Sequence, residues 1–338
     1  MKDVPIQVSA PTRVDLSGGT LDIPPLYIFH QPAYTINVAI ELRAKVCLTL
    51  RERGVSLLSK DRKKRVEAPT LDHLNARKNP QLGLLIYAMK NYGREGMHLE
   101  TEIEAPSGAG MGGSSALAIA IISALALAQK SHLPPEEVTI KRARGVETLT
   151  LGVPTGYQDY YSAYYGGLNI LQFTLEGVKR ETLYSPEFLQ KLEDFLMLVY
   201  TGKPHFSGAN NWALFREHME GKRRIILFFE QLKENALGMR ESVLKKDIWQ
   251  VGHWMRRDWE TRRKMLPEMS TEKIDLLVRK AREMGSIGER VCGAGGGGVL
   301  ALLCPPEKQE KLRGEIARCK GILLPCRVAR QGLVYRRG

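Results

Sequence analysis

The chain has 338 residues, 43% of them hydrophobic, which is enough to bury more than one core. Its five cysteines are odd in number and include no Cys-x-x-Cys pair, which argues against a disulfide scaffold and a structural zinc site. The formal net charge of +13 raises the hypothesis of nucleic-acid binding, but the basic residues are scattered and not interleaved with aromatic residues. A solvated basic surface that attracts anionic small molecules is the favoured interpretation.

The first residues and the longest apolar run indicate where in the cell the protein is expected. No apolar segment follows the first residues as a signal peptide requires. The apolar run at residues 116–128 is too short to span a bilayer and is typical of a buried helix. We therefore expect a cytoplasmic protein that binds neither membranes nor nucleic acid, and the sequence leaves a homodimer open.

In the first half of the chain, strand and helix patterns are mixed. Apolar periodicity and Gly/Pro punctuation predict strands over residues 6–16, 33–41, 44–51, 99–104 and 167–173. Helical spacing and start signals predict helices over residues 80–92, 115–129 and 134–151. A turn is expected at Gln158 and Asp159, before the last of these strands.

The second half begins with a strand at residues 195–201 and continues with long helical patterns. The predicted helices cover residues 212–235, 241–256 and 271–284, and the predicted strands cover residues 298–304, 322–329 and 333–336. The pattern indicates an α+β fold with two domains, which we place at residues 1–185 and 190–338.

The most informative segment is residues 106–116, Pro-Ser-Gly-Ala-Gly-Met-Gly-Gly-Ser-Ser-Ala, which joins a strand pattern to a helix pattern. Its four glycines allow the backbone N–H groups to approach a ligand, and the helix N-terminus adds unpaired donors, so the segment indicates a phosphate cradle. A P-loop is disfavoured because serine stands in place of its lysine, and a dinucleotide fold lacks its second strand. A capped turn without a ligand is the remaining alternative. The residues expected to hold the nucleotide are Pro106, Gly108, Ala109, Gly110, Met111, Gly112, Gly113, Ser114 and Ser115.

This segment resembles the Pro-x-x-x-Gly-Leu-Gly-Ser-Ser-Ala motif of the galactokinase, homoserine, mevalonate and phosphomevalonate (GHMP) kinases. Residues 10–22 resemble the N-terminal substrate motif of that family, and residues 291–300 resemble its C-terminal glycine motif. The run Asp22-Ile23-Pro24-Pro25 and the pair Gln158-Asp159 are most similar to sugar kinases of the D-glycero-D-manno-heptose-7-phosphate kinase type. Thr20-Leu21 departs from the expected Gly-Thr, which leaves the acceptor open.

The resemblance implies a two-domain GHMP kinase fold with the active site in the cleft between the domains. The N-terminal domain would resemble domain 2 of ribosomal protein S5, and the C-terminal domain would be ferredoxin-like. The resemblance also implies ATP and magnesium (Mg2+) as cofactors.

Two charged residues are candidates for catalysis. Phosphoryl transfer requires a carboxylate near the attacking hydroxyl and a cation near the developing charge. Asp159 matches the catalytic aspartate of the family, and Arg13 would neutralise it and the transferred phosphoryl group. The alternatives are a turn residue for Asp159 and a strand arginine paired with Asp15 for Arg13.

The resemblance also suggests acceptor and metal residues. The candidates for acceptor binding are Asp22, Gly18, Gly19, Gln158, Gly295 and Gly296, and the glycine motif is expected to stabilise the phosphate loop. Magnesium prefers oxygen ligands, and the candidates are Glu147 and Ser114, with Ser115 left open. Asn37 is expected to orient a site residue, and Lys203 and His205 are weaker candidates for a phosphate on the acceptor.

The sequence therefore predicts an ATP- and magnesium-dependent kinase of a sugar or sugar phosphate. A mevalonate-type or homoserine-type kinase and a catalytically silent sugar or ATP sensor are the alternatives. The presence of Asp159, Glu147 and Arg13 argues against the sensor.

Overall fold

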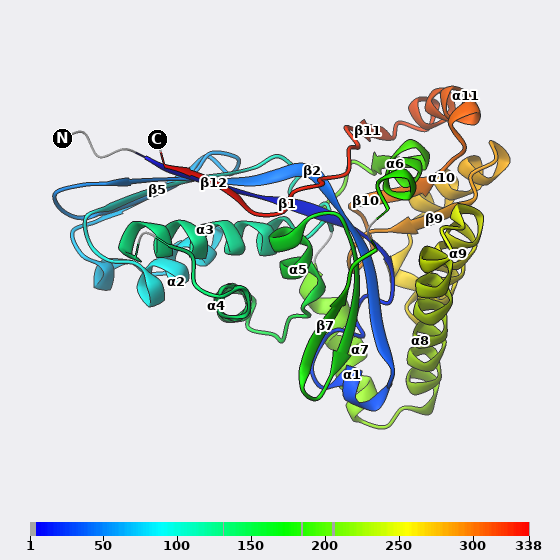
Figure 1. Cartoon of the computed structure of the whole chain (residues 1–338), viewed down its shortest axis with the longest axis horizontal. Helices are drawn as coiled ribbons and strands as arrows, with labels where there is room; N and C mark the ends of the chain where they lie inside the picture. The colour runs from blue at the N-terminus through cyan, green and yellow to red at the C-terminus, as the bar shows by residue number, and fades with distance from the viewer. Residues whose placement is uncertain (1–4, 131, 184, 205–206, 338) are drawn as a thin grey trace.

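The computed structural model describes residues 5–130, 132–183, 185–204 and 207–337, which form two α+β units joined side by side (Figure 1). The first unit contains an eight-stranded sheet in the order β12-β1-β2-β5-β3-β4, with β6 paired to β2 and β7 to β6. Its strands are β1 (Ile6–Ser17), β2 (Ala33–Leu50), β3 (Val55–Ser59), β4 (Lys64–Ala68), β5 (Met97–Ile103), β6 (Leu168–Thr174), β7 (Gly177–Glu181) and β12 (Val334–Arg337). The predicted α+β class is confirmed.

Strand β2 is one strand of 18 residues where the sequence pattern predicted two. Residues 44–50 pair with β5 and residues 33–38 pair with β6, while β1 runs antiparallel to nearly its whole length. Residues 327–329 close the gap between β5 and β6, since Glu41 N donates to the Arg327 carbonyl and Ala329 N donates to the Ala39 carbonyl. On the edge of β1 that faces away from β2, the backbone N–H of Arg13 donates to the Met111 carbonyl at 2.9 Å. The glycine-rich loop therefore meets the sheet where β1 presents Arg13.

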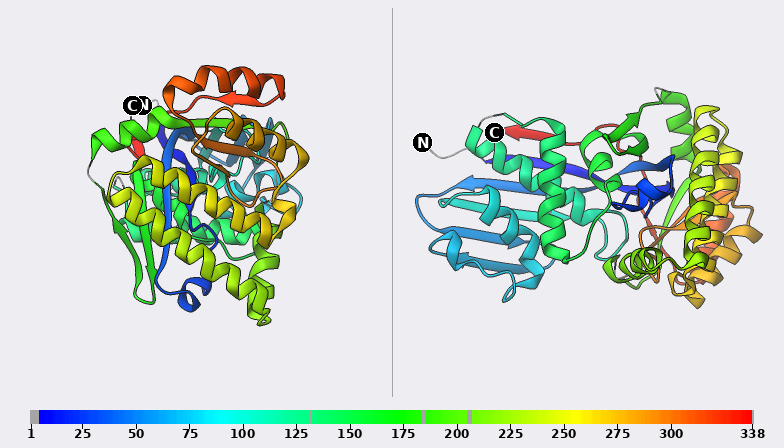
Figure 2. Two further views of the ribbon diagram at one scale, coloured as in Figure 1. Left: turned by 90° about the vertical axis from the view of Figure 1, so that its right-hand side faces the viewer. Right: turned by 90° about the horizontal axis from the view of Figure 1, so that it is seen from below.

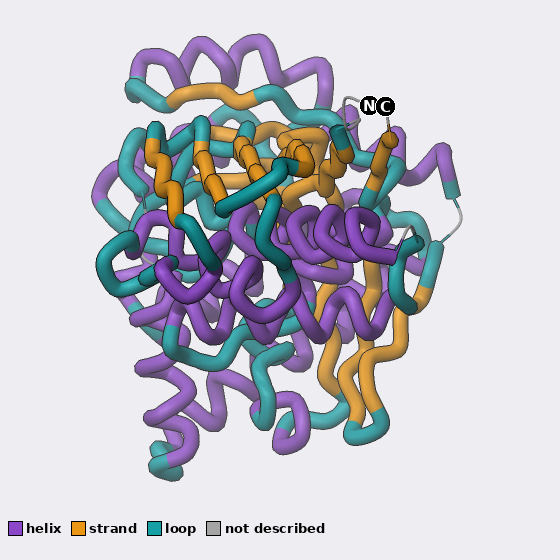
Figure 3. The backbone as a smooth tube through the Cα atoms, turned by 90° about the vertical axis from the view of Figure 1, so that its left-hand side faces the viewer, coloured by secondary structure: helices purple, strands orange, loops and turns teal. Residues whose placement is uncertain are grey.

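Four helices cover one face of this sheet, as the view in Figure 3 shows with strands lying over helices. They are α2 (Gly83–Tyr92), α3 (Gly113–Lys130), α4 (Glu136–Leu151) and α5 (Gln158–Tyr165). By length and composition alone, α3 could cross a membrane, and it is the one such helix among the described residues. However, 67% of its 18 residues are buried inside the protein. Because Ala, Leu and Ile occupy nearly every position from 116 to 127, α3 packs on all sides and forms the centre of the first core.

The second unit contains a four-stranded antiparallel sheet in the order β11-β8-β10-β9. Its two long helices, α8 and α9, lie side by side (Figure 2) and also contact the first unit through β1 and β2. Its strands are β8 (Leu196–Tyr200), β9 (Gly288–Val291), β10 (Val299–Leu303) and β11 (Ile322–Leu324). Its helices are α6 (Pro186–Phe195), α7 (Ser207–Met219), α8 (Arg223–Leu244), α9 (Ile248–Met265), α10 (Glu272–Glu283) and α11 (Pro306–Arg318). A short helix, α1 (Leu26–Phe29), follows β1 and faces this unit through Leu26, which packs with Phe229 of α8.

Three local features differ from the sequence-based predictions. Gln158 and Asp159 begin helix α5 and do not lie in a turn, because Tyr160 and Ala163 are buried and tertiary packing outweighs the weak helical pattern. A hairpin, β3–β4, forms around the basic run at residues 60–65. Strand β12 pairs with β1, so the end of the chain returns to the first sheet.

Candidate active site

A cavity of about 340 Å³ lies between the two units and is bordered by segments far apart in the sequence. One side is the glycine-rich loop, and all nine residues predicted to hold the nucleotide line it. Further parts of the lining come from Gly19, Thr20, Asp22 and Ile23, and from Trp212 and Phe215 of α7. Arg13, Glu147, Gln158, Asp159 and Arg262 also line the cavity.

The glycine-rich loop leads directly into α3, which begins at Gly113. Gly112 has φ +70°, and a Cβ at this position would lie 3.0 Å from Oδ2 of Asp159. A glycine is therefore required for the loop to pass this close to the carboxylate. The second glycine motif supports the loop from behind, since Val299 N donates to the Ala109 carbonyl at 2.9 Å.

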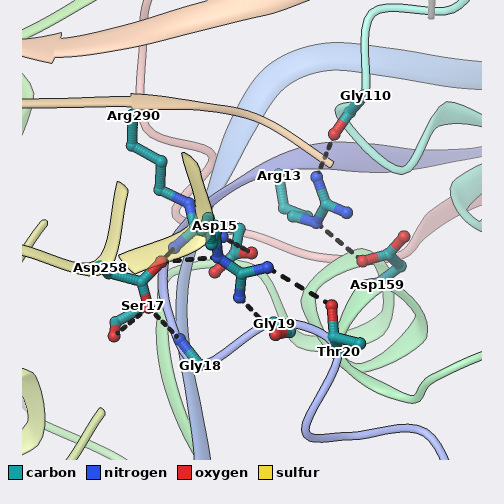
Figure 4. Close-up of polar contacts among 11 residues, drawn as sticks. Arg13, Asp15, Ser17, Gly18, Gly19, Thr20, Gly110, Asp159, Asp258 and Arg290 are labelled. Atoms are coloured by element: carbon teal, nitrogen blue, oxygen red, sulfur yellow. Dashed lines mark hydrogen bonds and ion pairs between the residues drawn. The ribbon is translucent and has the colours of Figure 1, made fainter. Parts of the chain in front are cut away.

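Arg13 forms an ion pair with Asp159, not with Asp15. Its Nε donates to Oδ1 of Asp159 at 2.7 Å, and its Nη1 donates to the Gly110 carbonyl (Figure 4). Burial lowers the pKa of Arg13, but the carboxylates of Asp159 and Asp15 outweigh it and the net shift is upward, so the guanidinium stays charged. One cation thus joins the glycine-rich loop to the candidate catalytic carboxylate.

Asp22 is buried beside the N-terminus of α5. Its Oδ2 accepts the backbone N–H groups of Tyr157 at 2.7 Å and Gln158 at 2.9 Å. Burial raises the pKa of Asp22 to about 6, although these two hydrogen bonds oppose the shift. The Oε1 atom of Gln158 is buried without a hydrogen-bond partner in the protein, and the residue lines the cavity. Such an atom is suited to accept a hydrogen bond from a bound molecule.

Glu147 lies at the base of the glycine-rich loop. The Ser115 hydroxyl donates to its Oε2 at 2.6 Å and the Tyr160 hydroxyl donates at 2.7 Å, and Ser114 forms a further hydrogen bond. Burial raises the pKa of Glu147, and these hydroxyls only partly oppose the shift. In the described part of the chain, no three His, Cys, Asp or Glu residues gather into a metal-binding group.

A buried cluster of charges, missed by the sequence analysis, holds the loop of residues 17–20. Asp258 of α9 accepts from the Ser17 hydroxyl at 2.9 Å, from Gly18 N at 3.1 Å and from Nε of Arg262 at 2.7 Å. Arg290 of β9 bridges Asp258 and Asp15. Arg262 also donates to the Gly19 carbonyl and to Thr20 Oγ1, the latter at 3.4 Å (Figure 4).

Some predicted residues lie away from the cavity lining. Gly295 and Gly296 pack against the backbone of Met269, and their neighbours Gly293 and Ala294 line the cavity. Gly18 packs against Tyr34 and Asp258.

The three weaker candidates have different surroundings. Asn37 Nδ2 donates to the Gln158 carbonyl at 3.4 Å. Lys203 is exposed and does not line the cavity, and His205 lies outside the described residues.

A histidine pair joins the segment that follows α1 to α7. His30, which follows α1, places its Nε2 2.7 Å from Nε2 of His218, and its Nδ1 donates to Glu230 Oε1 at 2.6 Å. Both rings are nearly buried and lie against Phe29 and Phe229. Since Nδ1–H of His30 donates to a carboxylate, its Nε2 accepts a hydrogen bond from Nε2–H of neutral His218.

Comparison with known proteins identifies the class. The family model described as "GHMP kinases N terminal domain" matches residues 82–167, and "GHMP kinases C terminal" matches residues 239–322. The chain belongs to the GHMP kinase family and is a phosphotransferase with a hydroxyl acceptor. The resemblance and the two-domain kinase fold predicted from three motifs are therefore confirmed.

Individual relatives extend this likeness over nearly the whole chain. D-glycero-alpha-D-manno-heptose 7-phosphate kinase of Campylobacter jejuni is 25% identical over 97% of this chain and 98% of its own. A mevalonate kinase of Methanothermobacter thermautotrophicus is 27% identical over 82% of this chain and 85% of its own. The crystal structure of a D-glycero-D-manno-heptose 1-phosphate kinase from Bacteriodes thetaiotaomicron has the same fold, with a TM-score of 0.77, 20% identity and 98% of both chains covered.

Asp258→Asn should destabilise the protein strongly, because it leaves Arg262 and Arg290 buried without their shared counter-charge. We expect the free energy of unfolding to fall by about 3 kcal/mol or more in urea denaturation. Glu241→Gln is the control, since Glu241 and Lys245 form an exposed pair at 3.9 Å and its loss should cost less than about 1 kcal/mol. An equal loss of unfolding free energy in the two variants would show that the buried cluster stabilises the fold no more than an exposed ion pair does.

The histidine pair predicts a loss of stability in acid. Burial lowers the pKa of both His30 and His218, although Glu230 opposes the shift at His30 while Lys233 favours it. The folded state therefore binds fewer protons than the unfolded state, whose histidines have a pKa of about 6.5. The stabilising contribution is present above that pH and disappears as pH falls through the lower folded pKa values.

Urea denaturation between pH 7.5 and pH 5 measures this effect. His218→Gln should flatten the dependence of unfolding free energy on pH, and His253→Gln, at an exposed position of α9, should leave it unchanged. A His218→Gln variant with the wild-type pH dependence would rule out the pair as the titrating groups.

Proposed function

We propose that this kinase transfers the γ-phosphate of ATP, with magnesium, to a hydroxyl of a sugar or sugar phosphate. The observation that carries the mechanism is the position of Arg13, which bonds both Asp159 and the Gly110 carbonyl of the glycine-rich loop. It places a carboxylate next to the loop where the phosphates would bind, with Asp22 and Gln158 bordering the same cavity. These are the elements that phosphoryl transfer needs, namely positioning and charge stabilisation.

In the proposed step, an acceptor hydroxyl lies against Asp159, which orients it and accepts its proton. The hydroxyl oxygen forms a bond to the γ-phosphorus while the bond from that phosphorus to the β–γ bridging oxygen breaks, and ADP leaves with that oxygen. Arg13 stabilises the negative charge on the transferred group and holds the Asp159 carboxylate in place. The backbone N–H groups of the loop and the N-terminus of α3 bind the phosphates.

The residues around Glu147 fit a magnesium ion. A buried carboxylate surrounded by hydroxyls from Ser114, Ser115 and Tyr160 offers the hard oxygen ligands that magnesium prefers, and the buried charge gains from a cation. When bound, magnesium would neutralise charge on the phosphate oxygens. Glu147 with Ser114 or Ser115 would hold it, and Tyr160 orients the carboxylate.

Two lines of support favour a sugar or sugar phosphate as acceptor. The relative that matches 97% of the chain is a heptose 7-phosphate kinase, and the run Asp22-Ile23-Pro24-Pro25 is typical of such kinases. Asp22 and the unpartnered Gln158 Oε1 provide acceptors for several hydroxyl groups. A mevalonate-type kinase is the second candidate, because a mevalonate kinase matches 82% of the chain.

We further propose a cytoplasmic enzyme whose partners are small molecules and not nucleic acid or a membrane. The scattered basic residues support this over a nucleic-acid interface, since they would attract ATP and a sugar phosphate. A homodimer remains compatible with this function.

An assay of ADP release tests the reaction and the acceptor together. With ATP and magnesium, we expect turnover with D-glycero-α-D-manno-heptose 7-phosphate, a hexose or L-fucose, and none with mevalonate. Asp159→Asn should lower kcat by about 10²-fold or more, because it removes the proton acceptor while keeping the shape of the side chain. The KM for ATP should change little.

The Asp61→Asn variant is the control for a general loss of negative charge at the cavity, because Asp61, between β3 and β4, also borders it. Turnover of mevalonate and of none of the sugars would show that the acceptor is mevalonate and not a sugar. Wild-type kcat in Asp159→Asn would remove Asp159 from the mechanism.

The magnesium requirement should depend on the group at Glu147. Glu147→Gln and Ser115→Ala should raise the magnesium concentration for half-maximal rate by about tenfold, because each weakens the oxygen ligands. Ser114→Ala shows which of the two serines matters more. Ser123→Ala is the control, since Ser123 lies buried in the same helix. An unchanged magnesium requirement in all three site variants would place the ion elsewhere.

A further inference from the structure

Two aromatic side chains of α7 line the cavity without a role in the mechanism above. Trp212 and Phe215 are one helical turn apart, and their rings stack with centroids 5.1 Å apart and planes within 13°. Trp212 keeps 39% of its surface exposed, which is unusual for so large an apolar side chain. The stack therefore presents a flat apolar surface to the cavity.

This surface lies at the acceptor side of the cavity and not at the phosphate side. Leu214, next to Phe215, is buried in one cluster with Leu21 and Ile23, the residues on either side of Asp22, and Phe215 packs against that cluster. The far end of α7 is fixed to the same segment through the pair of His218 and His30. Both ends of the described part of α7 are thus tied to the chain that carries Asp22.

The polar groups near this surface complete a site of mixed character. Asp22 is buried and borders the cavity, Gln158 Oε1 has no partner in the protein, and Arg262 borders the cavity with its guanidinium on Gly19 and Thr20. A sugar ring has an apolar face of C–H groups and an edge of hydroxyls. A flat aromatic surface matches the face, and carboxylate and amide oxygens match the edge.

We propose that Trp212, stacked on Phe215, packs against the C–H face of a sugar ring and so determines the preference for a cyclic carbohydrate acceptor. The inference rests on the proposed function and adds a residue to it. Trp212 contacts the acceptor in both ground and transition states and takes no proton. Its loss should therefore raise the KM for the acceptor far more than it lowers kcat.

Steady-state kinetics with D-glycero-α-D-manno-heptose 7-phosphate, D-galactose and L-fucose test the proposal on the full-length enzyme. Trp212→Leu should raise the KM of whichever of these sugars the wild type phosphorylates by on the order of tenfold, with an unchanged KM for ATP. Trp212→Phe keeps an aromatic face and should retain most of the affinity. Trp249→Leu is the control, because Trp249 is 56% exposed on α9 and does not line the cavity.

Fluorescence gives a second readout that a purely structural role would not produce. The same sugar should change the tryptophan emission of the wild type, and this change should be absent in Trp212→Phe even though its KM is nearly normal. An acceptor KM in Trp212→Leu equal to that of the wild type would overturn the inference alone, with the kinase function intact. Absence of turnover of every sugar by the wild type would overturn both the proposed function and this inference.

Discussion

The Asp258 carboxylate accepts hydrogen bonds from Arg262, Arg290, Ser17 and Gly18, so helix α9 and the loop beside the cavity share one buried cluster of charges. Transfer of such groups from water is costly, and it is tolerated here because two aspartates face two arginines. Asp258 and Arg262 also bond to the loop, whereas Asp15 Oδ1 and Arg290 Nε are buried without a hydrogen-bond partner among the described residues. An ion cluster of this kind specifies one arrangement, since a shift of either unit would separate charges that water cannot reach.

Strand β1 links the buried charge cluster to the residues proposed for catalysis. This strand carries Asp15 into the cluster and Arg13, two positions earlier, into the ion pair with Asp159, so one short stretch of β1 joins the packing of the second unit to the cavity. Fixing the strand fixes the distance between the glycine-rich loop and the carboxylate. A reaction that depends on positioning gains from such rigidity, because little reorganisation remains for the moment of transfer.

The two sides of the cavity are built by different physical means. The phosphate side consists of backbone N–H groups and a helix N-terminus, which suit any nucleotide phosphate and need glycines to come close. The acceptor side consists of side chains from α7, α9 and the segment around Asp22. Unlike the backbone groups of the phosphate side, these side chains define a particular shape and polarity. The family is therefore evident from the glycine-rich loop, whereas the choice of acceptor lies in side-chain packing between the units.

The sequence by itself determined the features that depend on local backbone chemistry. The kinase family, the α+β class and the nucleotide-binding loop were predicted from the glycines of residues 106–116, the apolar helix α3 and the three ordered motifs. These features could be predicted because they depend on residues that are close together in the sequence. The antiparallel pairing of β1 with β2 was not predicted from the sequence, since periodicity carries no information on register or partner.

Only the tertiary structure decided the contacts between distant residues. Asp258 lies 240 positions from Gly18, and Arg290 lies 275 positions from Asp15, so no spacing rule connects them. Helix α5 had too weak a pattern to be predicted and is stable because Tyr160 and Ala163 are buried. Trp212 and Phe215 have helical spacing that equally suits a core, and their place beside Asp22 follows from the packing of Leu214 on Leu21. Burial and charge pairing act through space, and they become defined only when the chain has brought these residues together.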